Sequence, residues 1–409
     1  MEDSVTLKRC INYPLLTFYG LGTIVGAGIY VLLGKVAGYA GYSVPFAFLI
    51  ASIVAGFTAF TYSELSSRFP KSAGEALYIA RAFDRKWLSA ITGYSIVAIG
   101  IISSATIVNG FVGYLEVFVT LPSWLVIIAL VLILGIVAGW GISQSVMLAT
   151  FITLLELGGL LFVLVAAGDV LVDLPDKFSL MLPTATAFSF QGLFLGAFLA
   201  FYAFIGFEDM VNIAEEVEDA PRTLPKAILT AIIVSSLLYV SIALVAVLAI
   251  PPETLGKSDA PMADIIAQRT NLSPLIISAI SLVAIINGAL IQIIMATRVL
   301  YGMSNQGIGH RLFQRINPKT RTPLWSTLFV SIAVLVMALW FPIVTLASIT
   351  SFITLIIFTM MHLALIRIKT SKVRQLEESE KGAVNFPVWI PMTGTVFSIL
   401  LLFMQFVSF

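Results

Sequence analysis

Long apolar stretches recur along the whole chain, and they restrict the folds that it can adopt. A helix needs about 20 apolar residues to cross the hydrocarbon core of a bilayer, and such runs appear repeatedly here. Only 11% of the residues are charged and 59% are hydrophobic, whereas soluble domains carry about 25% charged residues. The strand alternation typical of outer-membrane barrels is absent from the sequence. The sequence therefore predicts an all-α polytopic membrane protein.

We expect about eleven transmembrane helices. They are predicted at residues 15–38, 44–65, 87–113, 122–140, 146–168, 187–213, 227–250, 273–303, 324–340, 343–366 and 388–407. Lys8 and Arg9 precede the first apolar run, as basic residues do in a signal peptide. No small-residue cleavage site leading into a soluble region follows them, so we interpret this run as the first membrane helix.

The distribution of Lys and Arg predicts how these helices are oriented. With the N-terminus in the cytoplasm, all but four of the 23 basic residues fall on the cytoplasmic side; the exceptions are Lys35, Lys177, Lys257 and Arg269. Such an asymmetry follows the positive-inside rule and predicts a multi-pass protein of the cell membrane with a cytoplasmic N-terminus. It also supports the number of spans, because a missed helix would move every later loop to the other side.

The first span carries glycines at its centre, within the segment 23–28. Gly20, Gly22, Gly26 and Gly28 each weaken a helix by roughly 1 kcal/mol relative to alanine. A span can lose backbone hydrogen bonds only where protein or a water-filled cavity satisfies the freed groups, as at transporter substrate sites. Alternatively, glycines at this spacing let two helices pack closely. A second interrupted span favours the broken helix.

That second span is the sixth, where Gly206, Glu208 and Asp209 interrupt an apolar run. A charged side chain at membrane depth costs at least about 2.5 kcal/mol, so it normally faces a cavity or a partner. Gly26 and Gly206 each lie in the first span of a block of five, and two such blocks have opposite orientations because five is odd. This arrangement is typical of an inverted repeat with its site between two broken helices.

Several stretches resemble the amino acid–polyamine–organocation (APC) permeases. The resemblance is carried by the first-helix motif at 22–30 (GTIVGAGIY), the end of the second helix and its loop at 62–75 (YSELSSRFPKSAGE), the sixth-helix motif at 204–208 (FIGFE) with 214–217 (AEEV), Pro221-Arg222 and Leu224-Pro225 after it, and the end of the eighth helix at 298–303 (RVLYGM) with Gln306-Gly307. These motifs cover ten of the eleven expected spans in the family's order.

The resemblance implies a LeuT-type fold of five plus five helices, with helices 1 and 6 broken, and transport by alternating access. It implies the following division: a cytoplasmic N-terminus at 1–14, the first repeat at 15–170, the inverted second repeat at 187–366, a cytoplasmic loop at 367–387 and an additional helix at 388–409. Two features depart from the family. Members commonly have twelve spans, and many carry a lysine in helix 5 where this chain has Glu156.

The two breaks are the predicted substrate site. Free N–H groups at the start of a half-helix (Gly26, Ala27 and Gly28) suit a carboxylate, and free carbonyls at the end of the preceding one suit an ammonium group. The predicted substrate-binding residues are Thr23, Ile24, Gly26, Ala27, Gly28, Phe201, Ala203, Phe204, Ile205 and Glu208. The phenylalanines Phe201, Phe204 and Phe207 recur at helical spacing, which is more typical of packing, although one of them is a candidate lid.

Glu156 and Asn287 are the predicted ion-coupling residues. Glu156 lies among leucines at mid-membrane, and aligning the eighth helix with relatives places Asn287 beside it. Glu156 is either a protonated, hydrogen-bonded structural residue, or a proton carrier, a sodium ligand or a counter-ion for a cationic substrate. The lysine that relatives carry there is thought to replace a sodium ion and to take part in proton coupling, so a carboxylate inverts the local charge. Proton coupling is our first choice.

Other polar residues have simpler interpretations. Glu64 with Arg68, and the acids at 215–218 with Arg222, are expected as solvated faces and caps or as a cytoplasmic gate. Five hydroxyl side chains are candidate polar wall residues for the cavity, although hydroxyls in membrane helices usually bond their own helix. They are Ser103, Ser104, Thr350, Ser351 and Thr354.

The sequence offers little for catalysis or metal binding. Cys10 is the only cysteine, so neither a disulfide nor a cysteine metal cluster can form within the chain, and His310 and His362 are the only histidines. No nucleophile–base set or phosphate loop appears, so we expect no enzyme, no metal site and no cofactor beyond H⁺ or Na⁺ as coupling ion. The expected partners are a small amino acid or amine and the lipid bilayer, with no nucleic acid.

The sequence thus predicts a secondary active transporter of amino acids or related amines, proton-coupled through Glu156. The alternatives are a carrier or exchanger of polyamines or cationic amino acids, in which Glu156 and Glu208 neutralise the substrate, and a membrane sensor that binds amino acids without flux. The termini are short for a sensor.

Overall fold

A computed structural model describes residues 9–71, 74–140, 146–183, 187–305, 307–370 and 383–407. The predictions about Lys8 and Gln306, and the part of the predicted loop at 371–382, lie outside these ranges. Within them the chain is helical throughout, apart from connecting loops and one isolated β-bridge between Ile11 and Val217. The described part of the chain is therefore all-α, as predicted.

The first part of the chain forms α1 (Tyr13–Val25), α2 (Ala27–Ala40), α3 (Val44–Arg68), α4 (Gly74–Phe83), α5 (Lys86–Glu116), α6 (Ser123–Trp140), α7 (Val146–Ala166) and α8 (Leu174–Met181), with 3₁₀ segments at Gly41–Ser43 (η1) and Gly168–Asp173 (η2). The second part forms α9 (Ala187–Phe201), η3 (Tyr202–Phe204), η4 (Phe207–Glu216), α10 (Ala220–Ala249), α11 (Pro252–Leu255), α12 (Pro261–Arg269), α13 (Leu275–Asn305), η5 (Arg311–Gln314), α14 (Leu324–Trp340), α15 (Ile343–Thr370) and α16 (Trp389–Val407).

Many of these helices suit a bilayer. By length and composition, the described residues contain seven helical stretches that are able to cross a membrane, or up to eight if the bent pair Thr150–Ala166 and Gly168–Met181 is one span. Two shorter apolar helices lie at Leu324–Trp340 and Trp389–Gln405. The 56-residue stretch Tyr13–Arg68 counts as one of the seven, although it contains α1, α2 and α3. The chain is therefore a multi-pass membrane protein.

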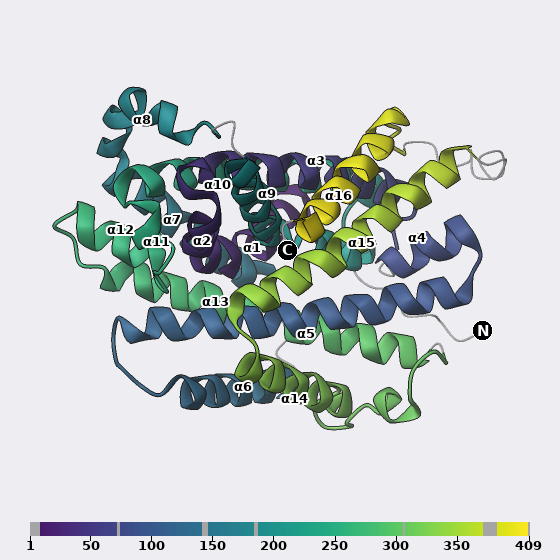
Figure 1. Ribbon diagram of the computed structural model, residues 1–409. Coiled ribbons are helices and arrows are strands. Elements are labelled where there is room, and N and C mark those ends of the chain that lie inside the picture. The colour runs from purple at the N-terminus through teal and green to yellow at the C-terminus, as the bar shows by residue number, and fades with distance from the viewer. Residues whose placement is uncertain are drawn as a thin grey trace.

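Packing brings distant segments together around α5 and α13. These two long helices lie against each other along their length, and α6 and α14 pack as a pair on one side of them (Figure 1). On the other side α1 packs on α10, α2 on α9, and α3 on both α9 and α10. Consequently the first interrupted helix and the second lie side by side within the bundle, with α5 and α13 close by.

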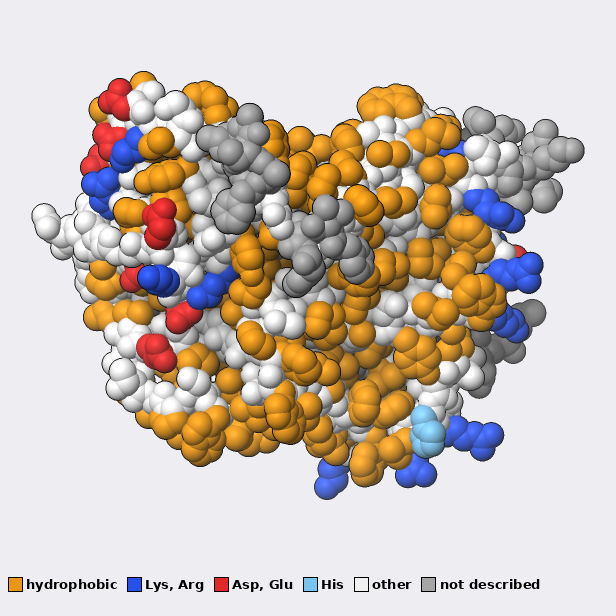
Figure 2. Space-filling model, viewed as in Figure 1, with side chains coloured by type: hydrophobic (Ala, Val, Ile, Leu, Met, Phe, Trp, Pro, Cys, Tyr) orange, Lys and Arg blue, Asp and Glu red, His pale blue; other side chains and the backbone are white. Residues whose placement is uncertain are grey.

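Charged side chains gather at the two ends of the bundle, and an apolar surface lies between them (Figure 2). The end near α4 and the N-terminus carries mainly Lys and Arg on this face, whereas the end near α8, α11 and α12 carries both signs. At that second end Lys35 pairs with Asp259 at 2.8 Å, and Lys177 and Arg269 both donate to the carbonyl oxygen of Leu248. Three of the four basic residues predicted on the outer side thus make contacts at this end.

Candidate functional site

The first predicted interruption is confirmed at Gly26. Its backbone (φ −46°, ψ −142°) leaves the helical region, so α1 ends at Val25 and α2 begins at Ala27. The Tyr239 hydroxyl from α10 donates to the carbonyl oxygen of Ile24 at 2.7 Å. A freed carbonyl at the break is therefore satisfied by protein, as a break inside a membrane requires.

The second interruption is also confirmed and is longer. After α9 the chain makes the 3₁₀ turn η3, passes through Ile205 in an extended conformation, and reaches Gly206 at φ 127°. The 3₁₀ helix η4 follows, and the Glu208 carboxylate accepts the Gly206 N–H at 2.8 Å. A positive φ of this kind is readily adopted only by glycine, which explains why Gly206 stands here.

The two breaks touch each other. A Cβ atom added to Gly206 would lie 2.4 Å from the carbonyl oxygen of Thr23, and one added to Gly28 would lie 2.7 Å from Cα of Ala203. Glycine is thus needed at both positions because one backbone lies directly on the other. Two segments far apart in the sequence are joined at the centre of the bundle by backbone contact.

A small cavity lies beside these breaks. It is lined by Thr23, Ile24, Gly26, Gly28, Ser103, Ile107, Tyr202, Ile205, Gly288, Ile291 and Gln292. Five of the predicted substrate residues are among them: Thr23, Ile24, Gly26, Gly28 and Ile205. Its volume is about 20 Å³, which has room for little more than one water molecule. The central cavity is therefore much smaller than an amino acid.

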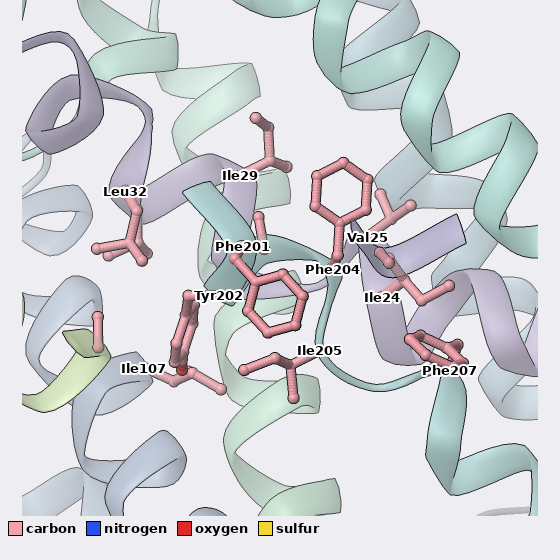
Figure 3. Close-up of a cluster of buried hydrophobic side chains, with 14 of the residues drawn as sticks. Ile24, Val25, Ile29, Leu32, Ile107, Phe201, Tyr202, Phe204, Ile205 and Phe207 are labelled. Atoms are coloured by element: carbon pink, nitrogen blue, oxygen red, sulfur yellow. The ribbon is translucent and has the colours of Figure 1, made fainter. Parts of the chain in front are cut away.

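Other residues predicted at the breaks do not line that cavity. Phe201, Ala203 and Phe204 are absent from its lining and from that of the second cavity described below. The Phe204 ring packs edge-on against Tyr239, with ring centroids 5.1 Å apart, and points away from Ile205 (Figure 3). Phe201 packs against Phe358 in the same way. These rings are fully buried packing groups, and Ala27 contributes the first residue of α2.

The structure brings Glu156 and Asn287 together, as expected. The Asn287 amide donates to Oε1 of Glu156 at 3.4 Å, across the interface of α7 and α13. Glu156 is fully buried, and its Oε2 has no hydrogen-bond partner in the described part of the chain. Neither residue lines the central cavity, although Gly288, the chain neighbour of Asn287, does. Glu156 is thus a buried carboxyl group with one oxygen free to bind a proton or a cation.

Of the hydroxyl side chains considered as polar wall residues, Ser103 lines the central cavity, whereas the bond within its own helix is found for Thr350. Ser103 bonds the Tyr202 hydroxyl at 2.8 Å, and Ser104 donates to the carbonyl oxygen of Ala289 at 3.0 Å, so both link helices rather than bonding their own. Thr350 does donate to its own helix, at Leu346. Ser103 and Tyr202 consequently form a polar bridge between α5 and the second break, at the wall of the central cavity.

Sequence reasoning missed Gln292. This residue lies in the apolar helix α13, lines the central cavity and also lines a second one. A buried amide in a membrane span usually faces a partner or a cavity, so its position alone was a usable signal. Gln292 is the lining residue that the two cavities share.

The second cavity is acidic and lies towards α4. It is lined by Tyr62, Glu75, Ile96, Ile99, Glu208, Asp209, Asn212, Gln292, Met295, Thr354, Ile357 and Phe358. We call it the acid cavity. Glu208 therefore lines this cavity and not the central one. The Tyr62 hydroxyl donates to Glu75 at 3.1 Å, and burial raises the pKa of Glu75 above its ordinary value.

Glu64 is not part of a solvated face. It is fully buried and accepts from Arg68 and Lys369, each at 2.6 Å, and from the Phe386 N–H at 3.0 Å. These contacts join α3, α15 and the segment before α16 into one charged cluster. The prediction of solvation fails because the C-terminal ends of α3 and α15 converge on this carboxylate. The exposed pair of Arg222 and Asp219, 3.8 Å apart, is solvated.

Metal ligands do not converge in the described ranges, where no group of three His, Cys, Asp or Glu side chains is arranged to hold an ion.

Comparison with known proteins identifies similar chains. The model of a family described as amino acid permease matches residues 11–409. The chain is 30% identical over 381 residues to cationic amino acid transporter 2, vacuolar, of Arabidopsis thaliana, covering 88% of this chain and 60% of that protein. It is 26% identical over 388 residues to a branched-chain amino acid permease of Bacillus subtilis (strain 168), covering 88% and 81%. It is also 26% identical over 397 residues to cationic amino acid transporter 4 of Homo sapiens, covering 91% and 62%. The chain thus spans about three fifths of the length of these cationic amino acid transporters.

Proposed function

The chain belongs to the amino acid permease family, and from this premise we propose that it is a secondary active transporter of amino acids or related amines. The observation that carries the proposal is the contact of two interrupted helices beside a small central cavity. Interrupted spans that expose backbone groups to a cavity are how secondary transporters bind substrate at mid-membrane. Family membership also supports a transporter in place of an enzyme.

The proposed architecture is the five-plus-five inverted repeat with eleven spans, divided at 15–170 and 187–366, with 388–409 as an additional helix. The two interruptions support it, because each falls in the first span of its block. The proposed orientation places the N-terminus and α4 in the cytoplasm of a cell-membrane protein. The concentration of Lys and Arg at that end of the bundle supports this orientation (Figure 2).

Substrate binding is proposed at the central cavity. The N–H groups at the start of α2 (Gly26, Ala27 and Gly28) bind the carboxylate, and the carbonyls that end α1 and η3 bind the ammonium group. The names of the relatives support amino acids as the substrate class, since they include branched-chain and cationic kinds. Because the cavity is too small for an amino acid, the helices that enclose it must separate to admit one. This is the alternating-access movement.

Coupling is proposed to run through a proton on Glu156, with Asn287 holding the carboxyl group in place. The free Oε2 of Glu156 and its complete burial support a proton carrier. The Asn287 amide gives the other oxygen a neutral donor, so protonation leaves that hydrogen bond intact. The second candidate is a carrier or exchanger of cationic amino acids or diamines, which the acids beyond the central cavity and the names of several relatives favour.

Uptake into proteoliposomes tests these proposals. Labelled leucine, arginine and putrescine are supplied while pH and sodium gradients are set independently. We expect an inward proton gradient to drive amino acid uptake. Glu156→Gln should abolish this proton-driven uptake but keep the exchange of internal for external substrate. Glu253→Gln, on α11, is the matched control. Uptake by Glu156→Gln with unchanged pH dependence would contradict proton coupling, and absence of uptake and exchange of all three compounds would contradict the transporter.

A further inference from the structure

The acid cavity brings several acidic side chains together. Three carboxylates line it, those of Glu75, Glu208 and Asp209, and the described lining includes no basic side chain. Glu75 and Asp209 are 3% and 5% exposed. Basic residues at this end of the bundle pair with other acids: Arg68 and Lys369 with Glu64, and Lys71 with Glu215.

The hydrogen bonds that the structure shows to these carboxylates come from neutral donors. Tyr62 donates to Glu75 at 3.1 Å, the Gly206 N–H to Glu208 at 2.8 Å, and the Gln292 amide to Asp209 at 3.5 Å. An ionised carboxylate has about four acceptor positions, so neutral donors in this number leave most of them unused. The carboxylates are therefore able to accept further donors from a ligand.

Two uncharged oxygens of the same cavity need donors as well. Oγ1 of Thr354 and Oε1 of Gln292 are buried, and neither has a hydrogen-bond partner in the described part of the chain. Their residues are 1% and 7% exposed, and both line the acid cavity. A buried polar atom left without a hydrogen-bond partner destabilises the folded protein. The cavity thus presents oxygen acceptors from four helices, which are α4, η4, α13 and α15.

The spacing of these acceptors favours an organic cation over a metal ion. The carboxylates share one cavity, yet the described residues contain no acidic group of three arranged to hold a metal. An ammonium group offers three N–H donors and a guanidinium group offers five, distributed over a wider span than a metal ion covers. An organic cation would give these oxygens both the positive charge and the hydrogen-bond donors that the lining does not supply.

We propose that the acid cavity is a second binding site, separate from the central cavity, for the ammonium or guanidinium group of an organic cation. The inference rests on the proposed transport function. Gln292 lines both cavities, so a substrate that leaves the central cavity towards α4 meets Gln292 first and the acids next. Glu75, Asp209 and Thr354 bind its cationic group there before release.

Titration calorimetry on the purified full-length protein tests the site. The probes are putrescine, which has two ammonium groups and no carboxylate, L-arginine and L-leucine. We expect putrescine to bind the wild-type protein. Glu75→Gln and Asp209→Asn should each weaken the binding affinity for putrescine and for arginine at least about tenfold. Leucine affinity should stay within about twofold, because leucine has no second cationic group.

Two further variants complete the design. Thr354→Val keeps the side-chain shape and removes one oxygen, so it should weaken putrescine binding by about threefold to tenfold even if a carboxylate variant fails to fold. Glu216→Gln changes a carboxylate on the same 3₁₀ helix that does not line the cavity, and it should leave all three affinities unchanged.

Several results would overturn the proposal. The first is that putrescine does not bind the wild-type protein. The second is that Glu75→Gln and Asp209→Asn bind putrescine as tightly as the wild type does. The third is that these variants lose affinity for leucine and for putrescine to the same extent. Binding of sodium or calcium ions in place of putrescine, removed by the same variants, would make the cavity a metal site and also overturn it. If the wild type transports leucine in each of these cases, the proposed function stands and only the second site fails.

Discussion

The two helix interruptions meet at the centre of the bundle, yet they are built differently. At the first, Gly26 alone separates two α-helices. At the second, a 3₁₀ turn, an extended residue and Gly206 at φ 127° precede a 3₁₀ helix of ten residues. Hydrogen-bond geometry in a 3₁₀ helix is poorer than in an α-helix, and a 3₁₀ stretch within a helix often marks a hinge. The second break is therefore the more deformable of the two.

Their polar groups differ in the same way. A hydroxyl from another helix, that of Tyr239, satisfies the Ile24 carbonyl at the first break. The second break satisfies the Gly206 N–H with Glu208 from its own segment. The Ile24 carbonyl at the first break thus depends on a donor from another helix, whereas the Gly206 N–H at the second break keeps its acceptor within its own segment. We infer that the first break holds the substrate and the second changes shape during transport.

The largest effect is expected from Gly206→Ala. Alanine rarely adopts φ 127°, and its Cβ would lie 2.4 Å from the Thr23 carbonyl oxygen, a backbone atom that cannot turn aside. Strain of this kind costs about 1–3 kcal/mol before the clash is counted. We expect leucine uptake into proteoliposomes to fall to background.

Gly56→Ala is the matched control for that experiment. Gly56 lies within α3, and a Cβ added there meets no atom within 4 Å. Alanine favours the helix by about 1 kcal/mol at such a site, so uptake and thermal stability should be kept or improved. If Gly206→Ala retained more than half of the wild-type uptake, the positive φ of Gly206 and its close contact with the Thr23 carbonyl would not be required for transport.

Much of this site could be predicted because it depends on the backbone. Glycines inside an apolar run weaken the helix wherever the chain folds, so the interruptions at Gly26 and Gly206 were visible in the sequence. Carboxylates at membrane depth require a partner or a cavity, which identified Glu156 and Glu208. The contact of Glu156 with Asn287 was predicted from the family resemblance and not from spacing.

The remaining features depend on which side chains meet across helices. Glu75 lies in a polar segment after α3 and looks exposed in the sequence, but folding of α4 against the bundle buries it in the acid cavity. Glu64 is buried because Lys369, more than 300 positions away, reaches it from α15. Tyr202 reads as one more apolar aromatic until its hydroxyl is seen on Ser103. No local pattern encodes these pairings.

A smaller effect is expected from Gly28→Ala at the first break. Its Cβ would lie 2.7 Å from Cα of Ala203, so the two segments must move apart. Gly28 has a helical backbone, so no conformational strain is added. We expect folded protein with about tenfold weaker leucine affinity, measured by calorimetry. Gly158→Ala, on α7 with no atom near the new Cβ, should bind leucine normally. An effect larger than that of Gly206→Ala would reverse the ranking of the two breaks.

The smallest effect is expected from Tyr239→Phe, which removes the hydroxyl and keeps the ring packed against Phe204. The Ile24 carbonyl at the first break then loses its donor, at a cost of about 1–3 kcal/mol. If the first break is fixed by its surroundings, this loss should lower the thermal midpoint and weaken leucine binding by about threefold to tenfold. Tyr39→Phe, at an exposed position on α2, should change neither quantity. If Tyr239→Phe bound leucine as tightly as the wild type, the first break would not depend on this hydroxyl. The contrast between the two breaks would then rest on the 3₁₀ geometry of the second one alone.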